Sequence, residues 1–121
     1  MSAKIPVTDA ELPIMKALWD KGCVPSPELF EGLPGNKSTL KTLLLRLVQK
    51  GAVGTEGINR RTYRYRALVT RDDYIAEQRQ SLLRRAFDGS AEKMLLNFVQ
   101  GENIPAEALR RLVDLIEEGE P

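Results

Sequence analysis

The sequence predicts a mainly α-helical protein with a small β-hairpin: a winged helix-turn-helix domain followed by a C-terminal helical dimerisation region. Three observations predict this fold. A short helix and a longer amphipathic helix follow each other across a tight turn at residues 33–35, and the hydrophobic period then changes from 3.6 to 2 over residues 52–66. After residue 70, three segments each carry one apolar stripe at helical spacing. We therefore expect a winged-helix DNA-binding domain at 1–70 and a helical dimerisation domain at 71–121.

The first predicted helix opens with a capping box. Thr8 and Glu11 stand three residues apart, so that each side chain can bond the backbone N–H of the other. Pro13 lies deep for a helix that starts at Asp9, because proline lacks the N–H that the helical ladder uses, and we expect an irregular first turn. The helix continues to about Asp20. Its buried face is expected to hold Ile14, Met15, Leu18 and Trp19, with Trp19 favoured as a core residue over a stacking residue.

A loop at residues 21–25 leads to a second, short helix. Ser26 as N-cap and Pro27 at the first helical position predict where this helix begins. Cys23 in the loop is the only cysteine, which excludes an internal disulfide and indicates a reducing compartment. We interpret Cys23 as a small hydrophobe, with a redox-sensing thiol as the alternative.

The segment from Asn36 to Gly51 is predicted to form an amphipathic helix, and the rest of the chain is interpreted around it. The Asn36 side chain can cap the first turn, and Gly51 can take the left-handed conformation that ends a helix. The inner face holds Leu40, Leu43, Leu44, Leu47 and Val48. The outer face carries small hydroxyls and long cations and no acid. That combination suits insertion into the DNA major groove, although an ordinary solvent-exposed basic helix is the competing interpretation.

A basic hairpin is predicted directly after this helix. Residues 52–56 and 61–66 have the alternation of strands, and residues 57–60 turn between them. Tyr63 and Tyr65 point to one side of the second strand and Arg64 to the other. The hairpin has the position of the wing in a winged helix, with Arg60 and Arg61 at its tip to reach a phosphate backbone or the minor groove. The alternative is an exposed hairpin whose arginines serve solubility.

The distribution of charge points to a polyanionic partner. The chain has a net charge of only +1, yet residues 36–66 contain eight basic residues and a single acid, Glu56. No apolar run of about 18 residues and no leader-like segment is present, so we expect a cytoplasmic protein without membrane insertion. Histidine is absent, and no metal-ligand cluster, phosphate-binding glycine loop or nucleophile–base pair stands out. We therefore expect no catalytic residue, no metal and no cofactor.

The three helices predicted after the wing cover residues 70–87, 90–100 and 106–118. Each has one apolar stripe, which is too thin to form an independent core. We expect two copies of the chain to wrap these stripes together into a homodimer. The competing interpretation is that the helices fold back onto the winged helix of the same chain. The residues expected at the dimer interface are Ile75, Leu82, Leu83, Met94, Leu95, Phe98, Leu109, Leu112, Val113 and Ile116.

The combination resembles the penicillinase-repressor family of bacterial transcription factors, the BlaI/MecI/CopY group. Four segments in order carry the resemblance over nearly the whole chain: TDAELPIMKALW at 8–19, KSTLKTLLLRLVQKGAV at 37–53, RTYRYRALVTRDDY at 61–74 and FDGSAEKMLLNFV at 87–99. The resemblance implies a winged-helix repressor that dimerises through its C-terminal helices and occludes a palindromic operator.

The resemblance also implies roles for individual residues. The DNA-facing helix positions of the family fall on Ser38, Thr39, Thr42 and Arg46, while Leu45 stands where a polar residue is expected and can meet a thymine methyl group. Family members that control β-lactam resistance are inactivated by proteolysis at an Asn–Phe bond in the dimerisation region. Asn97-Phe98 occupies the matching place here, although Phe98 would pack at a dimer interface in any case. Copper-responsive members carry paired C-terminal cysteines, and this chain has none.

Together these observations predict a repressor with three partners: double-stranded DNA with a palindromic operator, a second copy of the chain, and a sensor-activated protease. A hypothesis of another class is a winged helix used as a protein–protein adaptor without operator binding. Base readout is assigned to Ser38, Thr39, Thr42, Leu45 and Arg46. Phosphate contacts are assigned to Lys37, Lys41, Lys50, Arg60, Arg61 and Arg64.

Overall fold

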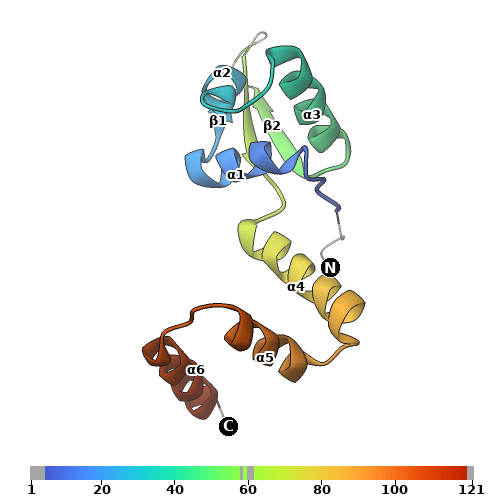
Figure 1. Ribbon diagram of the computed structural model, residues 1–121. Helices are drawn as coiled ribbons and strands as arrows, with labels where there is room; N and C mark the ends of the chain where they lie inside the picture. The colour runs from blue at the N-terminus through green and yellow to red at the C-terminus, as the bar shows by residue number, and fades with distance from the viewer. Residues whose placement is uncertain (1–4, 58, 60–61, 120–121) are drawn as a thin grey trace. The chain divides into compact units, whose positions relative to one another are not determined.

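The structure is a computed structural model that describes residues 5–57, 59 and 62–119. It divides into two compact units, Met1–Gln78 and Arg79–Pro121. Along the chain the elements are α1 (Leu12–Lys21), β1 (Val24–Pro25), α2 (Ser26–Phe30), α3 (Lys37–Gln49), β2 (Val53–Gly57), β3 (Tyr63–Ala67), α4 (Arg71–Phe87), α5 (Ala91–Gly101) and α6 (Ala106–Gly119) (Figure 1). This order confirms the predicted winged helix-turn-helix with a helical C-terminal region.

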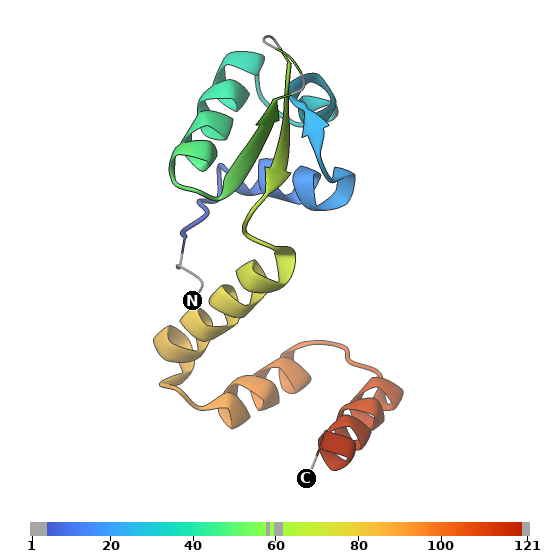
Figure 2. The same cartoon turned by 180° about the vertical axis from the view of Figure 1, so that it is seen from behind.

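The sheet of the first unit has three antiparallel strands in the order β1-β3-β2 (Figure 2). The predicted hairpin is formed by β2 and β3, in which Thr55 pairs with Tyr65. The strand β1 pairs Val24 with Tyr65 on the other edge of β3. The sequence interpretation of residues 21–25 as a loop was therefore wrong at Val24 and Pro25. A two-residue strand has no periodicity of its own, and it forms here because β3 offers an unpaired edge.

The core of the first unit lies between the three short helices and the sheet. The residues Ile14, Met15 and Leu18 of α1 are buried, as predicted, and they belong to one apolar cluster to which β1, α2, α3 and β2 also contribute buried residues. The other buried members of the cluster are Ala17, Val24, Leu29, Leu40, Leu44, Leu47, Ala52 and Val53. Trp19 packs against this cluster while remaining partly exposed.

The start of α1 combines a correct and an incorrect prediction. The capping box is formed: the Thr8 N–H donates to Glu11 Oε1 at 3.0 Å, and the Glu11 N–H donates to Thr8 Oγ1 at 3.2 Å. Residues 9–11 form a turn and the helix begins only at Leu12, so the predicted start at Asp9 was wrong. The expected irregular first turn is confirmed, since Pro13 is placed where its missing N–H removes no ladder bond.

The start of α2 also differs from the prediction. Pro25, which has extended backbone angles, takes the N-cap position, and Ser26 is already helical. The sequence had assigned Ser26 as the N-cap. Pairing of β1 with β3 holds Pro25 in the extended conformation, which moves the start of the helix by one residue.

The second unit continues α4 and contains α5 and α6. The predicted starts of α4 and α5 are confirmed by their caps: Thr70 Oγ1 accepts from the Asp73 N–H at 3.0 Å, and Ser90 Oγ accepts from the Lys93 N–H at 3.2 Å. None of the described residues of α4, α5 or α6 is buried. Because α4 belongs to both units, we keep the 70/71 boundary as a proposal for where DNA binding ends and dimerisation begins.

Candidate DNA-binding surface

Both ends of α3 are fixed by the residues expected to do so. Asn36 Oδ1 accepts a hydrogen bond from the Thr39 N–H at 2.8 Å. At the other end Gly51 adopts a φ of +86°, its N–H donates to the Val48 carbonyl, and the Ala52 N–H donates to the Leu47 carbonyl at 2.9 Å. These two bonds form a Schellman motif. Residues at its two ends therefore determine where α3 begins and ends.

The two faces of α3 are divided as predicted. Leu40, Leu44 and Leu47 are buried, while Leu43 and Val48 are half-buried. We call the opposite side the outer face of α3. Its residues are all exposed and include no acid: Lys37, Ser38, Thr39, Lys41, Thr42, Leu45, Arg46 and Gln49. Leu45, at 55% exposure, is a large apolar side chain presented to solvent in the middle of this polar surface.

A hydrogen bond within α3 sets the chemistry that Thr42 presents. The Thr42 hydroxyl donates to the Ser38 carbonyl at 3.1 Å, one turn back along the helix. Its proton is therefore used internally, and what remains for a ligand is an acceptor oxygen and a methyl group. On DNA such a group can accept from an adenine or cytosine amino group or contact a thymine methyl.

A groove lies beside the outer face, between α3 and the sheet. It has a volume of about 450 Å³, and Leu44, Val48 and Tyr65 are among the side chains that line it. The side chains that line it are Ser26, Lys41, Leu44, Leu45, Val48, Thr55, Tyr63 and Tyr65. Lys41 and Leu45 thus belong both to the outer face and to this groove. A nucleic-acid strand next to a helix in the major groove would meet these hydroxyl groups and this ammonium.

The sequence analysis missed Ser26, Thr55 and Tyr63 as candidate DNA contacts. The alternation of β3 correctly placed Tyr63 and Tyr65 on one side of the strand, but it did not show that this side faces α3. Tyr63 is 49% exposed, an unusual position for a tyrosine next to a core and the one signal that could have suggested a binding role.

The wing arginines divide into those the structure describes and those it does not. Arg60 and Arg61 lie outside the described residues. Arg64 is exposed, but strand alternation places it on the sheet face opposite to Tyr63 and Tyr65. Its cross-strand partner is Glu56, so it has a carboxylate neighbour on that face. Arg64 is therefore the weaker of the described candidates for a phosphate contact.

Lys50 has a different environment from the other predicted phosphate contacts. Its Nζ forms an ion pair with Glu11 Oε1 at 2.7 Å and donates to the Pro6 carbonyl at 3.0 Å. Only 26% of the Lys50 side chain and 2% of the Glu11 side chain are exposed. The ammonium joins the end of α3 to the segment before α1, and we therefore leave Lys50 out of the proposed DNA surface.

The Glu11 carboxylate is stabilised in its charged form. Burial raises the pKa of Glu11, but the hydrogen bonds from Lys50 and Thr8 and the Lys50 charge outweigh burial, so the net pKa is lowered. The Glu11 carboxylate therefore remains charged and paired with Lys50 at neutral pH.

Cys23 has surroundings that suit a structural thiol. Its Sγ lies 3.6 Å from Glu56 Oε2, and loss of solvent together with this carboxylate raises the pKa of the Cys23 thiol. A raised pKa reduces the reactive thiolate fraction, which favours the small-hydrophobe interpretation over a redox sensor.

The predicted dimer residues lie in α4, α5 and α6. Leu82, Leu83, Met94 and Leu109 are half-buried. Those exposed are Ile75, Leu95, Phe98, Leu112, Val113 and Ile116. The sequence analysis omitted two further exposed leucines, Leu96 and Leu115, because neither fits the narrow stripe used to choose the set. Ile75 belongs to the first unit, and the others belong to the second.

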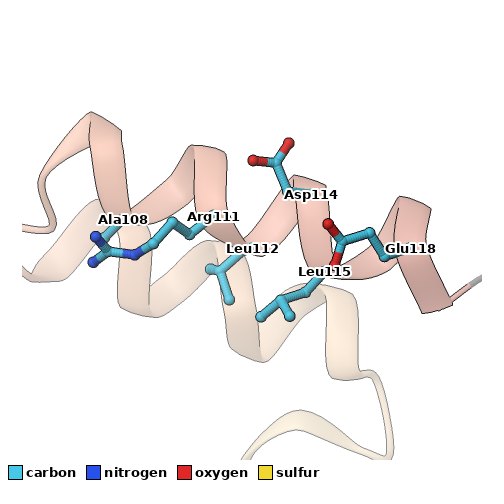
Figure 3. Close-up of a pocket in the computed structure, with 6 residues that line it drawn as sticks. All are labelled: Ala108, Arg111, Leu112, Asp114, Leu115 and Glu118. Carbon is cyan, nitrogen blue, oxygen red and sulfur yellow. The ribbon is translucent and has the colours of Figure 1, made fainter.

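An apolar groove runs along α6. It has a volume of about 520 Å³ and is lined by Ala108, Arg111, Leu112, Asp114, Leu115 and Glu118. Figure 3 shows Leu112 and Leu115 on one side of the helix, with Arg111 and Glu118 beside them. The groove combines two exposed leucines with charges of both signs.

The predicted cleavage site lies inside a helix. Asn97 and Phe98 are exposed residues in the interior of α5. A protease that binds an extended substrate would reach the bond between them only after α5 opens locally.

Two absences limit the chemistry of the described residues. They contain no group of three or more histidine, cysteine, aspartate or glutamate side chains able to hold a metal ion. No helix among them is long and apolar enough to span a membrane.

Comparison with known proteins identifies the family. The penicillinase repressor model matches residues 7–118. The chain belongs to the penicillinase repressor family. It is 33% identical over 122 residues to the penicillinase repressor of Bacillus licheniformis, covering 95% of this chain and 93% of that protein. It is 23% identical to the methicillin resistance regulatory protein MecI of Staphylococcus aureus, covering 91% of this chain and 92% of MecI.

A solved structure supports the same assignment at the level of the fold. The solution structure of the DNA binding domain of the repressor BlaI aligns with a TM-score of 0.52 and 28% identity, covering 61% of this chain and 94% of that domain. The penicillinase repressor family consists of DNA-binding transcriptional repressors and not of enzymes, so membership confirms both the resemblance and the functional class predicted from the sequence.

Proposed function

We propose that this DNA-binding repressor acts as a homodimer on a palindromic operator, with the outer face of α3 of each chain in a major groove. The observation that carries the proposal is the exposed, acid-free outer face of α3. Phosphates repel carboxylates, so a side without acids favours the entry of a helix into a DNA groove. A helix exposed only to water gains no such advantage from the absence of acids.

The proposed contacts fall into two groups. Base readout belongs to the middle of the outer face, where Arg46 can reach guanine and Leu45 a thymine methyl. Phosphate contacts belong to Lys37, Lys41 and the wing, and Tyr63 lines the same groove as Lys41. Full assignments are Ser38, Thr39, Thr42, Leu45 and Arg46 for bases, and Lys37, Lys41, Arg60, Arg61 and Arg64 for phosphates.

The proposal of a dimer is supported by the finding that none of the described residues of α4, α5 and α6 is buried. Three amphipathic helices without a core are unstable unless a partner covers their apolar side. A second copy is a suitable partner for α6, because charges of both signs flank Leu112 and Leu115 and a two-fold pair can place opposite charges against each other. Two linked DNA-binding units also bind more tightly than one through effective concentration.

We further propose that cleavage between Asn97 and Phe98 relieves repression. Cutting α5 would separate α6 from the rest of the chain and remove part of the dimer interface without altering α3. The second copy would then no longer hold both DNA-binding units on one operator. The position of the bond in a helix without buried residues supports access by local opening.

The central test is the binding of purified protein to a duplex selected by that protein from a random library. Arg46→Ala is expected to cost about 1–3 kcal/mol on the selected duplex and little on unrelated DNA. Lys41→Ala is expected to weaken both alike and to lower the salt slope by about one. Lys93→Ala in α5 is the matched control, since it removes an exposed cation outside the proposed surface.

Two results would contradict this proposal. If no duplex is enriched and binding is insensitive to salt, the protein–protein adaptor hypothesis replaces operator recognition by this chain. If Arg46→Ala weakens selected and unrelated duplexes equally, Arg46 is a phosphate contact. Sedimentation at micromolar concentration tests the dimer separately, and a monomer would contradict that part.

The cleavage proposal needs its own experiment. In the host that encodes the protein, Asn97→Ala is expected to leave operator binding intact and to prevent induction of the repressed promoter. Asn103→Ala, outside α5, is the control for loss of an asparagine. Unchanged induction of Asn97→Ala would discard cleavage at this bond.

A further inference from the structure

A cluster of contacts in the first unit holds the beginning of α4 against α1. Trp19 Nε1 donates to the Val69 carbonyl at 2.9 Å, across fifty positions of sequence. The Trp19 and Tyr74 rings lie 5.6 Å apart between centroids at an angle of 44°. The Arg71 guanidinium lies 5.3 Å from the centroid of the Trp19 ring and also donates to Asp20 Oδ1 at 2.9 Å. We call Trp19, Val69, Arg71 and Tyr74 the α4 joint.

The α4 joint is connected to α3 by backbone hydrogen bonds. Ala52 is fully buried, and its N–H donates to the Leu47 carbonyl at the end of α3. The Ala52 carbonyl accepts from the Leu68 N–H at 2.8 Å and from the Val69 N–H at 3.3 Å. A short path of bonds therefore runs from α3 through Ala52 and Val69 to Trp19 and the first turns of α4.

The Thr70 capping box strengthens this connection. The Asp73 N–H donates to Thr70 Oγ1 at 3.0 Å, which fixes the first turn of α4 directly after Val69. The helix then continues as one element to Phe87 in the second unit. The first turns of α4 are thus held on the first unit by contacts, whereas a flexible linker would leave them free.

We infer that Trp19 and Tyr74 are positioning residues that set the spacing of half-sites the repressor accepts. The inference rests on the proposed dimer: if two chains join through α4, α5 and α6, the direction of each α4 fixes where its α3 meets the duplex. Adding two base pairs rotates one half-site about 70° around the DNA axis, so a fixed joint discriminates spacings and a loose joint tolerates them. Neither residue needs to touch DNA for this effect.

The test measures spacing preference, which a role in stability alone would not change. Palindromic duplexes selected by the wild-type protein are rebuilt with one to four base pairs added or removed between the half-sites. For the wild type we expect the best spacing to bind about tenfold more tightly than one longer by two base pairs, and Tyr74→Leu should reduce this ratio to about twofold. Trp19→Phe, which keeps a ring but loses the Nε1 donor, should give an intermediate ratio.

Matched variants separate the joint from general destabilisation. Tyr74→Phe keeps the ring packed on Trp19 and should retain the wild-type ratio. Phe30→Leu trims a different partly buried aromatic residue of the same unit and should also retain it. Binding to a single half-site and the dimer dissociation constant should be the same for all variants.

An unchanged spacing ratio in a folded Tyr74→Leu protein would overturn the inference, as would an equal loss in Phe30→Leu. A wild-type dimer that binds the operator with no spacing preference would overturn the role inferred for the α4 joint and leave the proposed function intact. A monomeric wild type, or one that binds a palindrome no better than a half-site, would instead refute the proposed function and remove the role of the joint with it.

Discussion

The two units of the chain treat their apolar side chains in opposite ways. In the winged-helix unit, α1 and α3 each bury three or more residues in one cluster. In α5 and α6 of the second unit, no described residue is buried, although α6 has a well-defined apolar stripe. The apolar faces of α1 and α3 are thus buried within the chain, whereas the apolar faces of α5 and α6 stay exposed to solvent.

This difference indicates how each unit is stabilised. The winged helix closes its core through contacts between residues far apart in sequence, so its stability should not depend on protein concentration. Helices of 11 and 14 residues without a core are marginal in water, so the second unit should depend on association. The predictions that follow test this comparison, beginning with the largest expected effect.

The largest effect is expected from a charge in the uncovered face of α6. Ile116→Asp places a carboxylate at an exposed apolar position, and we expect it to prevent dimerisation and to weaken operator binding by about 10²–10⁴-fold. Sedimentation and DNA titration measure the two effects. Glu117→Asp, which introduces the same residue without removing an apolar side chain, is the control. A stable Ile116→Asp dimer would show that the second unit is covered by other means.

Truncation of a core side chain in α3 is expected to destabilise the winged-helix unit. Leu47→Ala removes a fully buried side chain and should lower the free energy of unfolding by about 2–5 kcal/mol at any protein concentration. Urea titration followed by the emission of Trp19, the single tryptophan, measures it. Leu115→Ala in α6 should leave this unfolding transition in place. If Leu47→Ala lowers the free energy of unfolding as little as Leu115→Ala does, the winged-helix unit has no independent core.

The ion pair of Glu11 and Lys50 gives the winged-helix unit a defined pH dependence. Because the pKa of Glu11 is lowered by folding, its contribution is complete above about pH 5 and is lost as the pH falls and the folded carboxylate is protonated. Glu11→Gln should cost about 1–3 kcal/mol at pH 7 and flatten the loss of stability between about pH 5 and pH 3.

Urea unfolding of both proteins across this pH range measures the Glu11 contribution. Glu28→Gln, at an exposed position of α2, is the matched control for loss of one carboxylate. Equal pH slopes in the wild type and in Glu11→Gln would remove Glu11 as the source of the acid sensitivity.

The smallest effect concerns the N-cap of α3. Asn36→Ala should lower the free energy of unfolding by about 1 kcal/mol, because the Thr39 N–H loses its acceptor. Asn36→Asp keeps an acceptor and should preserve stability, while its negative charge beside the outer face weakens DNA binding. Comparing urea unfolding with DNA affinity separates the two roles. Stronger DNA binding by Asn36→Asp would contradict the proposal that the outer face of α3 contacts DNA.

The sequence was sufficient where structure depends on residues close together in the chain. The caps at Asn36 and Ser90, the turn at Gly51 and the division of α3 into buried and exposed faces all follow from spacings of three and four residues. The same local patterns supported the family resemblance. The predicted start of α1 at Asp9 was wrong for an equally local reason, because Pro13 is accommodated only in a helix that begins at Leu12.

The tertiary structure alone decided which partners lie across long separations. Lys50 looked like one more cation of a basic segment, and only its distance to Glu11 revealed an ion pair. The strand β1, the groove that joins Tyr63 to Lys41, and the contact of Trp19 with Val69 likewise join segments that are far apart in sequence. A hydrophobic or charge pattern records which face a residue takes but not what it faces, because the partner is chosen by the packing of the whole unit.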